Sequence, residues 1–193
     1  LISAMGQVDD VTSCTTMDAK EAGNVIYLVG VTKRELGGSH WTLVNELDGG
    51  AVPTVCPENC NKTFPAVHQA IKSGLVRACH DLSEGGLAVA AAEMAFAGGL
   101  GLKLDLAKVA TDAGYQGDED TLIKLFSESN TRFLIEVAPE NCDAFESGLK
   151  GATLSRIGSV TEDDQLVVES GGQLLLSTPV GQLKEAWQSP LRW

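Results

Sequence analysis

The chain has 193 residues, of which 44% are hydrophobic and 21% are charged, and its formal net charge is −12. This composition is typical of one main globular domain and excludes a disordered chain, while the negative charge argues against general nucleic-acid or anionic-membrane binding. No apolar stretch approaches the roughly 20 residues of a membrane helix, and the first residues carry no charged region of a signal peptide. We therefore expect a cytoplasmic protein.

The first half of the chain is predicted to alternate between strands and helices. Residues 1–8 begin in apolar residues and are interpreted as a strand, and residues 25–30 form a continuous apolar run, as in a strand buried on both faces. A loop rich in Gly, Pro and Asn covers 48–62 and is long enough to cover a site. The elements predicted after it are a helix over 64–73, a strand over 75–79 and a mostly apolar, buried helix over 84–97.

The second half continues the alternation. Residues 100–106 alternate between apolar and polar types, which predicts a half-exposed strand. The remaining predicted elements are helix 121–127, strand 132–137, a helix through 149, strand 155–160, a hairpin over 165–177 turning at Gly171–Gly172, and helix 183–187. The fold class is therefore α/β, a mixed sheet packed with helices.

Cysteine usage indicates a reducing compartment. The five cysteines, Cys14, Cys56, Cys60, Cys79 and Cys142, are odd in number and scattered, which suits free thiols better than a disulfide framework. Cys56 and Cys60 form a C-x3-C pair, but no second pair has the spacing of a zinc site. We interpret these two as loop thiols and predict no metal site in the chain.

The segment His80-Asp81-Leu82-Ser83-Glu84-Gly85-Gly86 joins a predicted strand to the apolar helix and is the predicted functional surface. A helix that begins near Ser83 has unpaired N–H groups and a partial positive charge at its first turn, and Gly85 and Gly86 leave these groups open to a phosphate. The alternative is that Asp81 or Ser83 caps the helix and the glycines only permit close packing.

The side chains of this turn have two interpretations each. His80, the best catalytic candidate, either hydrogen-bonds a substrate or phosphate oxygen or is a structural donor to a neighbouring carboxylate such as Asp81. Asp81 is expected to orient His80 or to cap the helix. Ser83 and Glu84 either contact a ligand or stabilise the turn.

Two further segments are candidates for the border of the same site. Gly37, Gly38 and Ser39 either close over it or form an exposed hairpin turn. Glu128 and Arg132 form either an ion pair at the cleft or a solvated surface pair.

Five segments, in this order and spacing, carry a resemblance to a known family. They are Leu36–Ser39, His80–Ala88, Ala92–Gly99, Leu125–Ser129 and Arg132–Val137. Together they resemble formylglycinamide ribonucleotide amidotransferase, also called phosphoribosylformylglycinamidine synthase, over nearly the whole chain. The resemblance implies an aminoimidazole ribonucleotide synthetase C-terminal-like α/β domain over 23–193, with 1–22 as the tail of a preceding ATP-binding domain and a linker.

The resemblance also implies the chemistry and the partners. In the family, ATP phosphorylates the amide oxygen of formylglycinamide ribonucleotide, ammonia from glutamine displaces the phosphate, and magnesium balances the phosphate charge. The expected partners are this ribonucleotide, the preceding ATP-binding domains and a glutaminase domain or subunit. The implied substrate- and phosphate-binding residues are His80, Asp81, Ser83, Glu84, Gly85, Gly86, Gly37, Gly38 and Ser39, with ATP and magnesium held mainly outside this chain.

The chain also departs from the family pattern. None of its cysteines lies in the G-x-C-x-G setting of a glutaminase nucleophile, and His40–Trp41 replaces an acidic residue and a tyrosine. The family's ATP- and magnesium-binding segments and its proposed catalytic histidine lie upstream of the matched region, so we expect the chain alone to be inactive. The competing interpretations are a non-catalytic regulatory or assembly module of the same fold and another enzyme of the aminoimidazole ribonucleotide synthetase superfamily.

Overall fold

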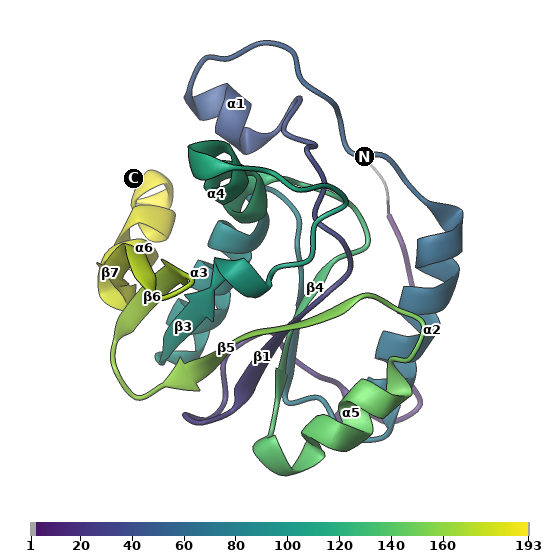
Figure 1. Ribbon diagram of the computed structural model, residues 1–193. Helices are drawn as coiled ribbons and strands as arrows, with labels where there is room; N and C mark the ends of the chain where they lie inside the picture. Colours follow the sequence, from purple (N-terminus) through teal and green to yellow (C-terminus); the bar gives the residue numbers. More distant parts are fainter. Residues whose placement is uncertain (1–2, 193) are drawn as a thin grey trace.

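A seven-stranded mixed sheet organises the computed structural model, which describes residues 3–192 (Figure 1). The strands are β1 Val25–Val29, β2 Ala78–Asp81, β3 Gly101–Asp105, β4 Phe133–Val137, β5 Leu154–Thr161, β6 Gln165–Ser170 and β7 Gln173–Pro179. Their order is β2-β4-β1-β5-β3-β6-β7, and every neighbouring pair is antiparallel except β3 and β6, which are parallel. The predicted α/β class with a mixed sheet is confirmed.

Helices cover both faces of the sheet. They are α1 His40–Val44, α2 Pro57–Lys72, α3 Gly86–Gly98, α4 Gly117–Phe126, α5 Cys142–Gly148 and α6 Val180–Gln188, with short 3₁₀ turns at Val11–Ser13, Leu106–Lys108, Pro139–Asn141 and Ser189–Leu191. Because side chains alternate along a strand, β1 contributes to two cores. Ile26 and Leu28 pack with α3, whereas Val25, Tyr27 and Val29 pack with α2 and α5.

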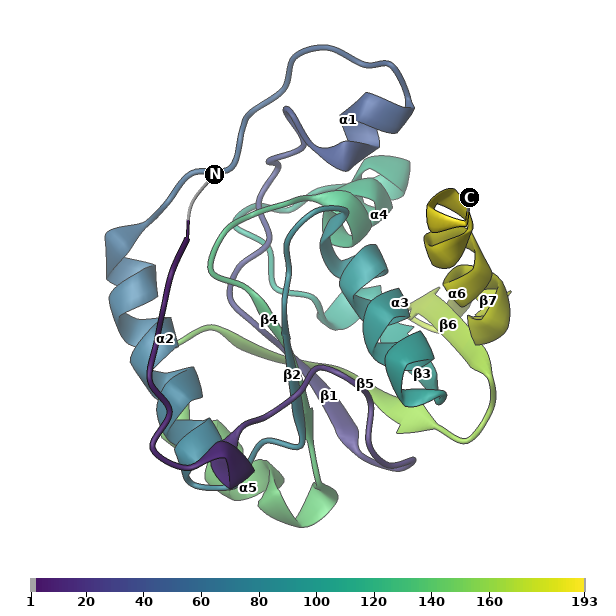
Figure 2. The same cartoon turned by 180° about the vertical axis from the view of Figure 1, so that it is seen from behind.

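Helix α3 is buried, as its apolar sequence predicts. Leu87, Ala91 and Met94 have no exposed surface. The C-terminal helix α6 packs along α3, with the rings of Phe96 and Trp187 5.6 Å apart (Figure 2). Helix α6 therefore covers α3 near its C-terminal end.

Helix α2 begins at Pro57, seven residues before the predicted start, so the predicted loop over 48–62 is wrong from residue 57 onward. Pro57 stands in the first turn, where its missing N–H costs no hydrogen bond, while Pro65 lies inside the helix. Cys56 precedes the helix and Cys60 lies within it, which corrects the interpretation of Cys60 as a loop thiol.

Other boundaries also differ from the predictions. His80 and Asp81 belong to β2 and do not follow it, because their backbone pairs with Leu134 and Phe133 of β4. The predicted strand over 1–8 is wrong for residues 3–8, which are exposed and irregular, and residues 1–2 lie outside the described residues. Helix α4 begins at residue 117 and not at 121, with acidic residues 118–120 in its favourable first turn.

The hairpin at the C-terminal end is confirmed. Gly171 and Gly172 join β6 to β7 with φ of 57° and 87°, values that favour glycine. Among residues 3–192, no helix has both the length and the apolar character needed to cross a membrane.

Candidate functional site

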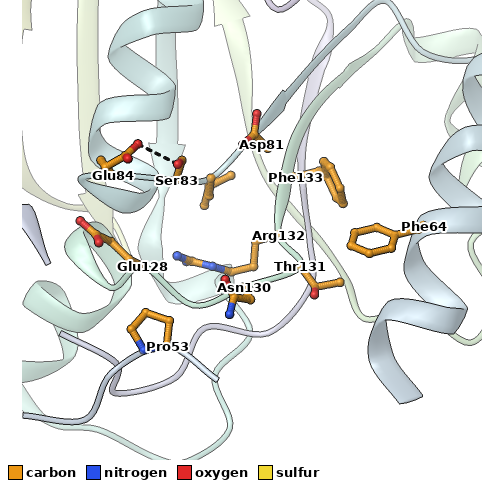
Figure 3. A pocket seen from close by; sticks show the side chains of 11 residues that line it. Pro53, Phe64, Asp81, Ser83, Glu84, Glu128, Asn130, Thr131, Arg132 and Phe133 are labelled. Atoms are coloured by element: carbon orange, nitrogen blue, oxygen red, sulfur yellow. Dashed lines mark hydrogen bonds between the residues drawn. The ribbon is translucent and has the colours of Figure 1, made fainter. Parts of the chain in front are cut away.

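A cavity of about 440 Å³ opens at the end of β2, beside the predicted functional turn (Figure 3). Its walls are the turn after β2, the segment 128–133 that leads into β4, Pro53 before α2, and Phe64 in the middle of α2. Its lining residues are Pro53, Phe64, Asp81, Leu82, Ser83, Glu84, Glu128, Asn130, Thr131, Arg132 and Phe133. The structure thus brings Asp81, Ser83 and Glu84 together with Glu128 and Arg132 around one space.

His80 lies on the other side of the strand end, in a second cavity of about 520 Å³ that it shares with Glu93. Its Nε2 is 2.7 Å from Glu93 Oε2, whereas its Nδ1 is 3.6 Å from Asp81 Oδ1, which is too long for a hydrogen bond. Glu93 is therefore the hydrogen-bonded partner of His80, while Asp81 faces the other ring nitrogen only at ion-pair distance. Sequence reasoning missed Glu93, although it is the single charged residue of α3.

The start of α3 differs from the prediction. The helix begins at Gly86 and not near Ser83, and its N-cap is Gly85, in the left-handed conformation with φ 76° and no side-chain cap. Neither Asp81 nor Ser83 caps it. Ser83 Oγ donates to Glu84 Oε2 at 2.8 Å, and this hydrogen bond is the main reason that the pKa of Glu84 lies below its usual value.

The two glycine amides predicted to bind a phosphate already have acceptors. Gly85 N donates to Glu128 Oε1 at 2.8 Å, and Gly86 N donates to the carbonyl of Ser83 at 3.1 Å. The carboxylate of Glu128 thus supplies the negative charge that a helix N-terminus favours. Binding of a phosphate at these amides stays a prediction, and it requires that the phosphate replace Glu128.

The segment Gly37–Ser39 starts a helix and does not form an exposed hairpin turn. Ser39 is buried and caps α1, since its Oγ accepts from Thr42 N at 3.3 Å. A Cβ on Gly37 would lie 2.4 Å from the carbonyl oxygen of Gly50, so only glycine permits this close approach. The segment lies beside the functional turn through His40, whose backbone N–H donates to Glu128 at 2.9 Å.

Arg132 does not pair with Glu128, which corrects both interpretations of these residues. Only 1% of Arg132 is exposed, and its guanidinium donates to the carbonyls of Ser127 and Ser129 and to Thr32 Oγ1. Burial lowers the pKa of Arg132 to about 10, so that it still carries its charge at neutral pH. The cavity therefore has three carboxylates and a buried cation, each of whose three nitrogens donates one hydrogen bond to the protein.

The three carboxylates make this cavity unfavourable for a triphosphate. A triphosphate needs cations or free donors, which the carboxylates of this cavity do not supply. Within the described part of the chain, no three His, Cys, Asp or Glu side chains form a group that could hold a metal. Burial raises the pKa of the Cys79 thiol to about 12, so this cysteine is no nucleophile at neutral pH.

The fold and the turn together define the class of this protein. A family model described as AIR synthase related protein, C-terminal domain, matches residues 21–171, and the chain belongs to this family. The chain is 33% identical, over its whole length, to phosphoribosylformylglycinamidine synthase subunit PurL of Alkaliphilus metalliredigens, strain QYMF. It spans 25% of that relative's length. The resemblance found in the sequence is confirmed.

Solved structures share the fold. Thermotoga maritima PurL complexed with FGAR superposes with a TM-score of 0.79 and 21% identity over 90% of this chain and 30% of that chain. The hydrogenase maturation protein HypE in complex with ATP matches with a TM-score of 0.62 and 17% identity, covering 88% of this chain and 54% of that chain. The proposed boundary between 1–22 and 23–193 stays a prediction.

Proposed function

We propose that the chain is one part of an ATP-dependent carbon–nitrogen ligase of purine biosynthesis. The ligase converts formylglycinamide ribonucleotide to formylglycinamidine ribonucleotide in the cytoplasm, with ammonia derived from glutamine. The observation that carries this proposal is the 33% identity, over the whole chain, to a relative named phosphoribosylformylglycinamidine synthase. A structural neighbour described as complexed with FGAR and another described as complexed with ATP support it.

The cavity supports a role in holding the ribonucleotide and not the ATP. Carboxylates accept hydrogen bonds, so Asp81 and Glu84 suit the hydroxyl and amide N–H groups of a ribosyl glycinamide better than a triphosphate. ATP, magnesium and the glutaminase are therefore assigned to the rest of the protein and its partners. By this proposal the chain forms one wall of the active site and has no turnover alone.

His80 is the proposed catalytic candidate, and it lines the neighbouring 520 Å³ cavity, which shares Asp81, Ser83 and Glu84 with the 440 Å³ cavity. Its imidazole is held by Glu93 at 2.7 Å and is mostly shielded from solvent, which limits its freedom of rotation. An imidazole fixed by a carboxylate on one nitrogen can exchange a proton through its other nitrogen. Asp81, Ser83 and Glu84 are proposed to contact the ligand from the adjoining turn.

The test is ammonia-driven, FGAR-dependent ADP release by the complete protein, comparing His80→Ala with His68→Ala. His68 lies on the exposed face of α2 and is the matched control. Loss of a general acid–base group lowers kcat/KM by about 100-fold or more, and we expect this for His80→Ala alone.

Equal activity in the wild type and a folded His80→Ala variant would exclude a catalytic role of His80. Absence of FGAR-dependent ADP release in the wild type would contradict the proposed ligase and favour the non-catalytic module of the same fold.

A further inference from the structure

The carboxylate of Glu128 joins two segments that are far apart in the sequence. Its Oε1 accepts hydrogen bonds from Gly85 N at 2.8 Å and from His40 N at 2.9 Å. Gly85 is the N-cap of α3, and His40 is the first residue of α1. Figure 3 shows the Glu128 side chain at the edge of the cavity, near the turn that carries Ser83 and Glu84. One oxygen atom therefore connects the starts of two helices.

Glu128 is itself held firmly. Its backbone N–H donates to the carbonyl of Glu35 at 3.3 Å. The neighbouring Ser127 and Ser129 bond to the backbone of Lys33, and the buried Arg132 donates to the carbonyls of both serines. Only 14% of the Glu128 side chain is exposed. Because its backbone is hydrogen-bonded and its carboxylate is mostly shielded from solvent, Glu128 is held in one position.

The segment that Glu128 holds has one further contact with the end of α4, where the ring of Trp41 stacks on Phe126 with the centroids 4.4 Å apart. Residues 36–54 form a long segment that contains α1. Its two ends are joined by Glu35, whose Oε1 accepts hydrogen bonds from Thr54 N at 3.0 Å and from Thr54 Oγ1 at 2.8 Å. Several apolar side chains within it, among them Leu43, Val44 and Val52, are more than half exposed. Between residues 3 and 192, no hydrogen bond joins the 36–41 segment directly to the 81–86 turn. Glu128 is the link between them.

We infer that Glu128 is a positioning residue, which fixes His40 at the start of α1 against the Asp81–Gly86 turn and so holds in place the turn that lines the ribonucleotide site. This inference rests on the proposed function for its effect on substrate binding, but the link itself does not. A hydrogen bond to a charged group is stronger than a neutral one, and two amides that share one carboxylate lose both bonds together when it is removed.

Hydrogen exchange of the complete protein, followed by mass spectrometry, tests the link without any substrate. For Glu128→Ala we expect exchange about tenfold faster or more in peptides that contain His40 and Gly85. Glu128→Gln keeps an oxygen that accepts from both amides, so its exchange should stay near that of the wild type. Glu119→Ala removes an exposed carboxylate of α4 and is the matched control.

The steady-state KM for FGAR in the same variants tests the positioning role. We expect Glu128→Ala to raise this KM about tenfold, with substantial recovery in Glu128→Gln and no change in Glu119→Ala. Unchanged exchange in Glu128→Ala would overturn the link. Faster exchange with an unchanged KM would overturn the positioning role. A wild type without FGAR-dependent turnover contradicts the proposed function alone, since the exchange result still decides the link.

Discussion

Gly86→Ala is expected to destabilise the chain by about 3 kcal/mol or more, because it combines a strained backbone with a clash that no side chain can relieve. Gly86 has φ 62°, and a Cβ placed on it would lie 2.4 Å from the carbonyl oxygen of Ser127 and 2.9 Å from that of Leu125. Both contacts are backbone atoms at the end of α4, so the helices must separate. Urea unfolding followed by circular dichroism measures the loss.

Gly99→Ala is the matched control for this prediction. Gly99 ends the same helix with nearly the same φ, 68°, yet a Cβ added to it would have no neighbouring atom within 4 Å. The free energy of unfolding of this variant should fall by only about 1 kcal/mol, which is the cost of placing alanine in a left-handed backbone conformation. Equal losses in the two variants would show that the packing of α3 against residues 125–127 is not what requires glycine at position 86.

Arg132→Ala is expected to cost about 4 kcal/mol, since it leaves buried acceptors without donors. The guanidinium serves the carbonyls of Ser127 and Ser129 and the hydroxyl of Thr32. The single ammonium group of lysine cannot reach all three acceptors as the planar guanidinium does. Arg132→Lys should therefore restore little of the lost free energy of unfolding. The free energy of unfolding from urea denaturation is the measurement.

Arg34→Ala is the control for the loss of a cation. Arg34 is 68% exposed in its side chain and pairs with Glu119 on the surface, a pair worth less than about 1 kcal/mol. A loss in Arg132→Ala no larger than that in Arg34→Ala would contradict the view that this guanidinium holds the 127–132 segment together.

Local patterns in the sequence predict most elements because the patterns themselves are local. The apolar run of β1 and the apolar helix α3 are buried as expected, and glycines mark the β6–β7 turn. The start of α2 differs from the prediction because Pro57, Asn59 and their neighbours are residue types common in loops, whereas the buried residues of α2, Thr63, Val67 and Ala70, all lie further along the helix. The alternation of strands and helices along the chain also gave no indication that nearly all neighbouring strands of the sheet are antiparallel.

A cavity lies beside the turn that the sequence predicts as a functional surface, but the contacts of that turn were not predicted. Residue types at the turn after β2 indicated a functional surface, and the cavity lies there. The roles of Glu93 and Glu128 depend on pairs separated by 13 and 43 residues, His80–Glu93 and Gly85–Glu128, which no local pattern specifies. An isolated charge in an apolar helix was the available signal for Glu93.

A crystal structure of the complete protein with FGAR bound tests most directly whether this turn forms part of the substrate site. We expect the ligand in the 440 Å³ cavity, with polar atoms within hydrogen-bonding distance of Asp81, Ser83 or Glu84. A fully occupied ligand elsewhere in the protein, with none of its atoms near this turn, would contradict the proposed role of the chain.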